Sequence, residues 1–491
     1  MPGGMSINSG FANNIMWKMI DLVSRKVFGF VISIVLARLL VPEAYGVIAL
    51  TTVFIAFTNI FILNGFNISL IRKETVESID YSTVMVLSLS FVTLINVIIF
   101  FSAPYIASFY EVPELSSVLR VMVFGLYFSA ISAIVSAKAT RELKFKQMAI
   151  PSFISNALGG LIAVLIAYLG GGVWALVAQH IFASLILMIW MIILFKFPLS
   201  FDFSWSVFRS HLAFSMGVIG TSFLEFLGNH VSSLFVGKVY KTNGLGLYDR
   251  ANVMPEMISI NLAGAISNVL LPTLAMHQGE LGYTKGMARK TISMSFFIIL
   301  PIMFGLIGCA SIFVPVLLTE KWIPMIPLLY ITCIFYAVAP IRTIEYGLLY
   351  ALGRSDLAVK VESLRAVLSI SGVVLVSIVA KLDIVYVAVA NLLICFFVSF
   401  FVHLWVKKLI GYKFKELFVD VLPTLSSSLI MMLVLMGIST ILETSWISLL
   451  CLIVGGGLLY LLLSFAFKNK NLVFLREYVK NLRPGSQSYE I

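Results

Sequence analysis

Long apolar segments follow one another along most of the chain, and only short polar connections separate them. Each segment approaches or exceeds the ~20 residues that a helix needs to cross a hydrocarbon layer about 30 Å thick. Strands of an outer-membrane barrel would alternate apolar and polar residues, and these runs do not alternate. The pattern therefore predicts an all-α integral membrane protein with about 14 transmembrane helices. The expected spans are 13–37, 44–71, 81–109, 115–137, 148–169, 173–195, 210–237, 250–276, 286–317, 325–352, 357–380, 384–409, 417–441 and 446–467.

Short matches recur at an offset of 200 residues and indicate an internal repeat. Gly46 corresponds to Gly246, for example, and Leu70 corresponds to Leu270. Two repeats of six helices would run parallel and be related by an axis along the membrane normal, with a transport path between them. The chain would then consist of an amino-terminal lobe over 1–195, a second lobe over 196–409, and two appended helices with a cytoplasmic tail over 410–491.

The composition excludes a water-soluble fold and changes how the net charge is interpreted. Hydrophobic residues make up 60% of the chain, charged residues 12%, and the mean hydropathy is +1.03. A net charge of +11 is typical of nucleic-acid binding, but here the Lys and Arg residues lie in short connections between apolar runs. With the amino terminus in the cytoplasm, the inward connections hold roughly three times as many of them as the outward ones. We therefore expect cytoplasmic amino and carboxyl termini and no nucleic-acid partner.

The residues that carry most enzyme chemistry do not occur in recognisable arrangements. The four cysteines lie within apolar runs without a paired spacing, and the five histidines are scattered. The sequence has no zinc-protease, serine-hydrolase or phosphate-loop motif and no paired catalytic carboxylates. These observations predict a protein without catalytic residues, metal or cofactor.

Polar and charged side chains recur at helical spacing inside several expected spans. In the first span they follow one another at intervals of four, three and four residues, and so form one stripe. Arg25 and Glu225 are separated by the repeat offset of 200 residues, so they occupy equivalent positions, and their charges are opposite. The residues concerned are Asn14, Lys18, Asp21 and Arg25 in the first span, Glu225 and Asn229 in the seventh, Glu256 in the eighth, Arg342 and Glu345 in the tenth, and Glu362 and Arg365 in the eleventh.

Two interpretations of these side chains stay open. A charge near the bilayer centre costs about 2.5–3.5 kcal/mol, so several charges are not expected to face lipid. In the first interpretation, the charged side chains form structural pairs with one another. In the second, they line a water-filled cavity in which Arg binds an anionic group such as diphosphate through two parallel hydrogen bonds. Arg25, Glu225 and Arg342 are the strongest cavity candidates. The structural pairs would be Lys18 with Asp21, Arg342 with Glu345, and Glu362 with Arg365.

Several short motifs carry information through their order and spacing. They are Ala37-Arg38-Leu39-Leu40-Val41-Pro42-Glu43-Ala44-Tyr45-Gly46, Arg141-Glu142-Leu143-Lys144-Phe145, Gly246-Leu247-Tyr248, Glu320-Lys321-Trp322 and Pro327-Leu328-Leu329. With these motifs the chain resembles the polysaccharide transporters of the multidrug/oligosaccharidyl-lipid/polysaccharide (MOP) exporter superfamily, nearest to the exopolysaccharide flippases of the colanic-acid and teichuronic-acid type. The likeness extends over nearly the whole chain.

This resemblance implies a fold, a substrate and a set of binding residues. The fold would be MATE-like, with two six-helix lobes that open alternately to each side of the plasma membrane. The substrate would be an oligosaccharide repeat unit on undecaprenyl diphosphate, with coupling to H⁺ or Na⁺ and with polysaccharide polymerase or assembly proteins and membrane lipids as partners. In the cavity, Lys18, Arg25 and Arg342 would bind the diphosphate together with Asn14 and Asn229. Charge pairing or ion coupling would involve Asp21, Glu225, Glu256, Glu345, Glu362 and Arg365.

Two other functions remain as alternatives. A drug/cation antiporter of the same superfamily would favour an acidic cavity, which Glu225 and Glu256 fit and Lys18, Arg25 and Arg342 oppose. A membrane-embedded glycan polymerase would need a large extramembrane loop or a cluster of catalytic acids. No connection in the sequence is long enough for such a loop.

Overall fold

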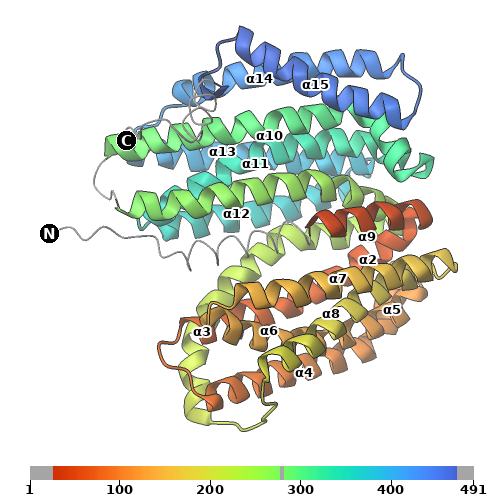
Figure 1. Cartoon of the computed structure of the whole chain (residues 1–491), viewed down its shortest axis with the longest axis vertical. Helices are drawn as coiled ribbons and strands as arrows, with labels where there is room; N and C mark the ends of the chain where they lie inside the picture. Colours follow the sequence, from red (N-terminus) through yellow and green to blue (C-terminus); the bar gives the residue numbers. More distant parts are fainter. Residues whose placement is uncertain (1–25, 277–280, 473–491) are drawn as a thin grey trace. The chain divides into compact units, whose positions relative to one another are not determined.

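The computed structural model describes residues 26–276 and 281–472, and within these ranges the chain is helical apart from turns and connections (Figure 1). The expectation of an all-α membrane protein is confirmed. Eleven helices in the described residues are long and apolar enough to cross a membrane, or twelve when one bent helix is counted as a span. The first expected span begins among residues 1–25, which lie outside the described ranges. The number 14 therefore stays a prediction.

The chain divides into two compact units, unit 1 (Met1–Gly246) and unit 2 (Leu247–Ile491). The lobe boundaries expected from the repeat, 195/196 and 409/410, stay a prediction. Helix α9 contributes residues to both units. Unit 1 contains a helix over 26–39, then α2 (Pro42–Asn59), a π-helical turn (Ile60–Phe66), α3 (Asn67–Arg72), α4 (Ser78–Tyr110), α5 (Glu114–Phe124), α6 (Leu126–Arg141), α7 (Phe145–Tyr168), α8 (Val173–Phe195) and the first part of α9 (Trp205–Met276).

Local sequence signals account for several helix ends in unit 1. Helix α2 begins at Pro42, whose fixed φ suits a first helical turn. At the start of α4, the Glu77 backbone N–H donates to Asp80 Oδ2 at 2.9 Å, so the carboxylate satisfies a free donor of the first turn. The Arg141 guanidinium donates to the carbonyl oxygens of Leu70 and Glu74 and thereby caps the end of α3. This contact accounts for the arginine of the motif Arg141-Glu142-Leu143-Lys144-Phe145.

The helices of unit 1 bury small residues and expose large apolar ones. Gly159 of α7 faces α8, and an added Cβ would lie 2.9 Å from both the Gln179 carbonyl oxygen and the Ala183 Cβ. Phe101 and Leu165, in contrast, are 70% and 59% exposed. Small residues let helix backbones approach closely, while a large apolar surface is stable only against hydrocarbon. This distribution fits a multi-pass membrane protein.

The 200-residue offset has a structural counterpart inside unit 1. The start of α2 packs on the part of α9 that lies 200 residues further along the chain. A Cβ on Gly46 would overlap the Thr242 carbonyl oxygen, and a Cβ on Gly246 would overlap the Pro42 carbonyl oxygen. Segment 42–46 therefore packs on segment 242–246, and both glycines are required by the close approach of the two backbones.

Helix α9 bends twice within unit 1. The first bend, of 47°, separates Trp205–Leu212 from Ser215–Leu262. The second lies at Lys241, whose φ of 61° is in the left-handed region. Close to this second bend, Asn243 Nδ2 donates to Glu43 Oε1 of α2. The backbone at Lys241 is non-helical, so the two spans expected over 210–237 and 250–276 lie on two helical segments that meet at this kink.

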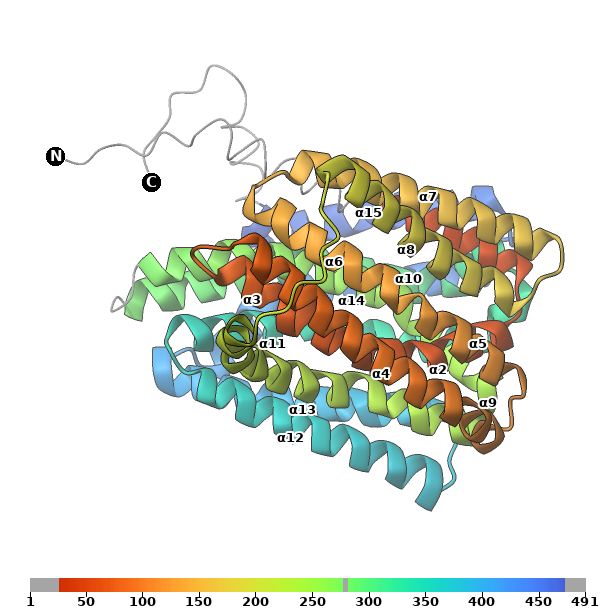
Figure 2. The same ribbon diagram turned by 90° about the horizontal axis from the view of Figure 1, so that it is seen from below.

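Unit 2 consists of the remainder of α9 and six further helices. Figures 1 and 2 show α11 and α13 side by side, with α12 packed on α13 and α10 between α11 and α14. Asp383 caps α13 by accepting from the Val385 N–H at 3.2 Å, and Gly411 ends the same helix at a φ of 71°. The helices are α10 (Leu281–Leu318), α11 (Ile326–Ala351), α12 (Ser355–Val374), α13 (Ile384–Ile410), α14 (Phe414–Ser439) and α15 (Trp446–Ala466), with a 3₁₀ turn over Glu320–Met325 and a π-helical turn over Leu375–Val379.

Candidate functional site

A group of hydrogen-bonded polar side chains connects α11 and α12 inside unit 2. Arg342 and Tyr346 are four residues apart and share one face of α11, while Glu362 and Arg365 share one face of α12. The Tyr346 hydroxyl donates to Glu362 Oε2 at 3.1 Å, and Arg365 Nε donates to Glu362 Oε1 at 2.8 Å. The expected pairing of Glu362 with Arg365 is therefore present. Both side chains are less than one fifth exposed.

Arg342, beside this group of polar side chains, has a hydrogen-bond donor without a partner among the described residues. Its Nη1 atom is buried and has no hydrogen-bond partner in the part of the chain that the structure describes. Glu362 lies within electrostatic range, but both of its oxygens already accept hydrogen bonds from Tyr346 and Arg365. A buried donor without a partner costs about 1–3 kcal/mol, and more when it is charged. Such a group calls for a specific explanation, and an anionic ligand is one.

Tyrosines and amides extend the polar surface toward α9 and α13. Tyr336 lies close to Glu256 and within electrostatic range of Arg342. Asn391 Nδ2 donates to the Tyr248 hydroxyl at 3.1 Å, and Asn391 Oδ1 accepts from Ser369 Oγ of α12 at 3.2 Å. The sequence analysis missed Asn391 and Tyr336 as site residues. A single amide in the apolar run over 384–409 was the available signal for Asn391, since buried amides in membrane helices require partners.

Glu345 turns away from Arg342 to a different partner. Its Oε1 atom lies 2.6 Å from His403 Nδ1 of α13, and the two side chains are 0% and 1% exposed. The suggested pair of Arg342 with Glu345 is therefore replaced by a contact with a residue 58 positions away. Glu345 Oε2 and His403 Nε2 have no further hydrogen-bond partner among the described residues.

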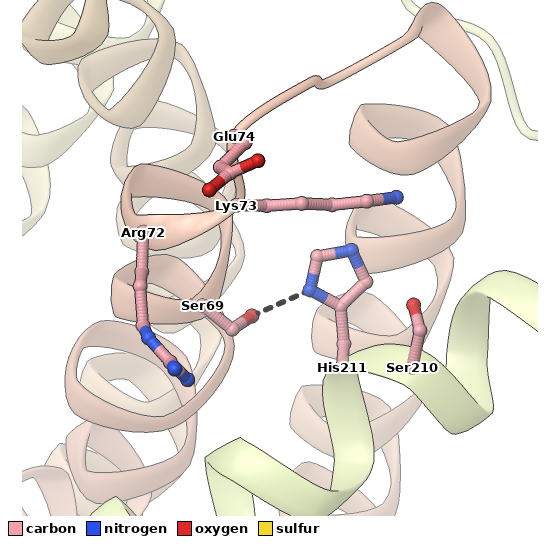
Figure 3. Close-up of a pocket in the computed structure, with 6 residues that line it drawn as sticks. All are labelled: Ser69, Arg72, Lys73, Glu74, Ser210 and His211. Carbon is pink, nitrogen blue, oxygen red and sulfur yellow. Dashed lines mark hydrogen bonds between the residues drawn. The ribbon is translucent and has the colours of Figure 1, made fainter.

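A second polar cluster lies in unit 1, where α3, α4 and the start of α9 meet. His211 Nε2 lies 3.1 Å from Asp80 Oδ1, and His211 Nδ1 lies 2.9 Å from Ser69 Oγ. Lys73 Nζ also donates to Asp80 Oδ1. A pocket of about 300 Å³ opens beside the ring, and Figure 3 shows Lys73 extended above it. The lining residues are Ser69, Arg72, Lys73, Glu74, Ser210 and His211.

The remaining predicted site residues divide into described and undescribed positions. Asn14, Lys18, Asp21 and Arg25 lie outside the described residues. Glu225 and Asn229 lie on the first part of α9 in unit 1 with exposed side chains, and Glu256 is exposed in unit 2. A carboxylate on the surface of a spanning helix faces water or another part of the protein rather than hydrocarbon.

Comparison with known sequences settles the family. Residues 35–327, more than half of the chain, match the family described as "Polysaccharide biosynthesis protein". The chain belongs to this family. The matched range includes the pocket in unit 1, whereas Arg342, Glu345, Glu362 and Arg365 follow it in the sequence.

Two curated relatives and one solved structure extend the comparison of this polysaccharide biosynthesis protein. The succinoglycan biosynthesis transport protein ExoT of Rhizobium meliloti (strain 1021) is 24% identical over 63% of the chain and 63% of its own length. The lipopolysaccharide biosynthesis protein WzxC of Escherichia coli (strain K12) is 22% identical over 88% of the chain and 90% of its length. The lipid II flippase MurJ, in an inward closed conformation, superposes with a TM-score of 0.73 at 15% identity, covering 95% of the chain and 100% of MurJ.

These matches confirm the resemblance to polysaccharide biosynthesis and transport proteins, and the MurJ superposition confirms the fold. The chain spans about 63% of the length of ExoT. Substrate, coupling ion and site residues of this polysaccharide biosynthesis protein are therefore matters for proposal.

Proposed function

We propose that this protein is a flippase that moves an oligosaccharide linked to undecaprenyl diphosphate from the cytoplasmic to the outer leaflet of the bacterial plasma membrane, for synthesis of a surface polysaccharide. Family membership and the transport and lipopolysaccharide functions named for ExoT and WzxC support this proposal. The lipid-linked substrate named for MurJ agrees with it. Both termini would be cytoplasmic, and the partners would be membrane lipids and proteins of polysaccharide polymerisation or assembly.

The observation that carries the proposal is the buried Arg342 Nη1 atom, which has no hydrogen-bond partner among residues 26–276 and 281–472. A lipid diphosphate offers several anionic oxygens, and the planar guanidinium binds such oxygens through parallel hydrogen bonds. Tyr346 and Arg365 already satisfy Glu362, which lies within electrostatic range, and Arg342 Nη1 has no hydrogen-bond partner among the described residues. A diphosphate would supply the missing acceptors.

The neighbouring side chains suit a glycan that is rich in hydroxyl groups. Tyr248, Tyr336 and Tyr346 each combine an apolar ring with a hydroxyl, and Asn391 offers both a donor and an acceptor. The polar surface would replace the hydration of the sugars during passage, while the lipid tail stays in hydrocarbon. Passage would proceed by alternating access, in which binding favours one state over the other.

Exposed carboxylates are compatible with the alternative function of a drug/cation antiporter. Glu225 and Glu256 are exposed on α9, and an acidic path would favour export of an organic cation. In the flippase proposal these acids serve charge pairing or coupling to H⁺ or Na⁺, together with Asp21. Lys18, Arg25, Asn14 and Asn229 would complete the binding site with Arg342.

The test reconstitutes the full chain in liposomes that contain a fluorescent undecaprenyl-diphosphate oligosaccharide. Accessibility of the glycan to an added glycosidase then reports the leaflet in which it lies. A hydrogen bond to a charged group contributes about 1.5–3 kcal/mol, so we expect Arg342→Ala to slow translocation about 10- to 100-fold. Arg342→Lys should recover only part of the rate because it lacks the planar fork.

Arg354→Ala is the matched control. Arg354 lies in the connection before α12, and its bonds to Asp356 at 3.0 and 3.1 Å are on the surface. This variant should translocate like the original protein, because exposed ion pairs contribute little. Translocation at the original rate by Arg342→Ala, at equal protein content, would refute the binding role. Export of a fluorescent cation without glycan translocation would favour the antiporter instead.

A further inference from the structure

The start of α9 is tied to unit 1 at one buried histidine. His211 stands at the end of the short segment Trp205–Leu212, directly before the 47° bend of α9. Its ring contacts Ser69 of α3 at 2.9 Å and Asp80 of α4 at 3.1 Å, and both His211 and Asp80 have 2% of their side chains exposed. The contact therefore fixes the position of this first segment relative to α3 and α4.

Water has a route to the ring. The pocket beside His211 holds about 300 Å³, and a water molecule occupies about 30 Å³ in the liquid, so several waters fit. Figure 3 shows the His211 ring between Ser69 and the extended Lys73 side chain, with Ser210 on the same helical turn. A proton can thus reach the ring without separation of the helices.

Counting hydrogens shows what a proton changes. Asp80, a carboxylate, accepts from the Glu77 N–H through Oδ2, so the ring Nε2 that faces Oδ1 must carry a hydrogen. Ser69 has a single hydroxyl hydrogen but two acceptors within reach, the Phe66 carbonyl oxygen at 2.6 Å and His211 Nδ1 at 2.9 Å. When the ring is neutral, the Ser69 hydroxyl can donate to only one of these two acceptors. A second ring proton lets Nδ1 donate to Ser69 Oγ while Ser69 donates to Phe66.

The protonated ring therefore makes one more hydrogen bond than the neutral ring, and its contact with Asp80 becomes an ion pair. Positively charged side chains around the same site oppose protonation of the ring. Lys73 shares Asp80 Oδ1 but is one third exposed and hence partly screened by water. The other charged groups around the ring are Arg72 after α3, Glu74 and Glu77 before α4, Arg141 of α6 and Arg209 of α9.

We propose that proton binding at His211 closes a latch that holds Trp205–Leu212 against α3 and α4, and that loss of this proton releases the segment at the bend of α9. The order Ser69–His211–Asp80 resembles a hydrolase triad. Ser69 is 5% exposed, however, and its hydroxyl is engaged by Phe66, so the arrangement serves attachment rather than nucleophilic attack. The latch goes beyond the proposed function, since it requires no particular substrate.

The test measures the position of the segment directly. Spin labels at Ser206→Cys on α9 and Ser78→Cys on α4 are introduced into the full chain, with its four native cysteines replaced, in lipid nanodiscs without substrate. We expect a single short distance at pH 5.5, where the latch is closed, and a longer, broader distribution at pH 8.5, where it is released. His211→Gln, which stays neutral, should give a distribution that does not change with pH.

His403→Gln is the matched control, because it alters the other buried histidine–carboxylate contact and should leave the pH response intact. If His211→Gln fails to fold, Ser69→Ala serves in its place. It removes the acceptor of the second ring proton and should reduce the change of the distance with pH. A distance that is constant with pH in the original chain, or a pH response that persists in His211→Gln, overturns the latch. Neither outcome depends on whether the protein translocates a glycan.

Discussion

Separating Glu345 from His403 tests how much a buried polar contact stabilises unit 2. The two side chains are 0% and 1% exposed, and Oε1 lies 2.6 Å from Nδ1. The ring also packs on Tyr412 and Phe414, at centroid distances of 5.2 and 4.3 Å. His403→Leu keeps much of this packing but leaves the Glu345 carboxyl group without its donor.

The expected loss follows from two limits. Breaking a buried ion pair by removing one partner costs about 3–5 kcal/mol in soluble proteins, whereas hydrogen bonds between membrane helices average about 0.6 kcal/mol. The Glu345 contact is fully buried, and its Oε2 atom already lacks a partner among the described residues, so no second bond compensates. We therefore expect His403→Leu to destabilise the protein by about 2–4 kcal/mol.

The assay is reversible unfolding by SDS in mixed micelles, followed by the fluorescence of the fully buried Trp322 and of the other tryptophans. His403→Leu, Glu345→Leu and the double variant form a cycle. Replacing both polar partners by apolar ones costs less than leaving one unpaired, so the double variant should be more stable than the sum of the single losses implies, by about 1.5 kcal/mol or more. Strictly additive losses, or an unchanged His403→Leu, would refute the reasoning.

Two further predictions concern the contacts of α9 in unit 1. Gly46→Ala places a Cβ against the Thr242 carbonyl oxygen, which belongs to the backbone and cannot rotate away. We therefore expect the free energy of unfolding to fall by about 1–3 kcal/mol in the same assay. Gly29→Ala, where an added Cβ meets nothing, should leave the stability unchanged. Lys241 and Lys238 hold the pKa of the Glu111 carboxyl below its ordinary value of 4.5, so their ion pairs stabilise the fold above that pH and are lost as the pH falls through the lowered pKa. The stability difference between the original chain and Glu111→Gln should therefore shrink as the pH is lowered toward 3, and a difference that does not change with pH would contradict this assignment.

The sequence predicted the helices well wherever an apolar run had clear ends. The expected span 173–195 coincides with α8, and 384–409 differs from α13 by one residue. Turn residues at Asn243-Gly244 predicted a break between two spans, and the structure has a kink with a non-helical backbone two residues earlier, at Lys241. The exact position was not predictable from turn residues, because the close packing of α2 on this part of α9 involves residues about 200 positions apart.

The candidate site was predictable only as far as its contacts are local in sequence. Glu362 and Arg365 are three residues apart on one helix, so their pair follows from helical spacing. The partner of Glu345 comes from another helix, and periodicity within one helix carries no information about such a contact. For the same reason, the sequence did not reveal that His211 and Asp80, 131 positions apart, meet beside a pocket.

The glycine crossing of α2 and α9 has a consequence for motion. Pro42 meets Gly246 and Gly46 meets Thr242, and no side chain separates the two backbones. Backbones in direct contact cannot slide or separate without opening a void, so the crossing keeps its geometry while more distant parts of these helices bend. This crossing is thus suited to act as a pivot. Probes attached at Glu43 and Asn243 should keep one separation throughout a transport cycle while probes farther from the crossing move apart and together.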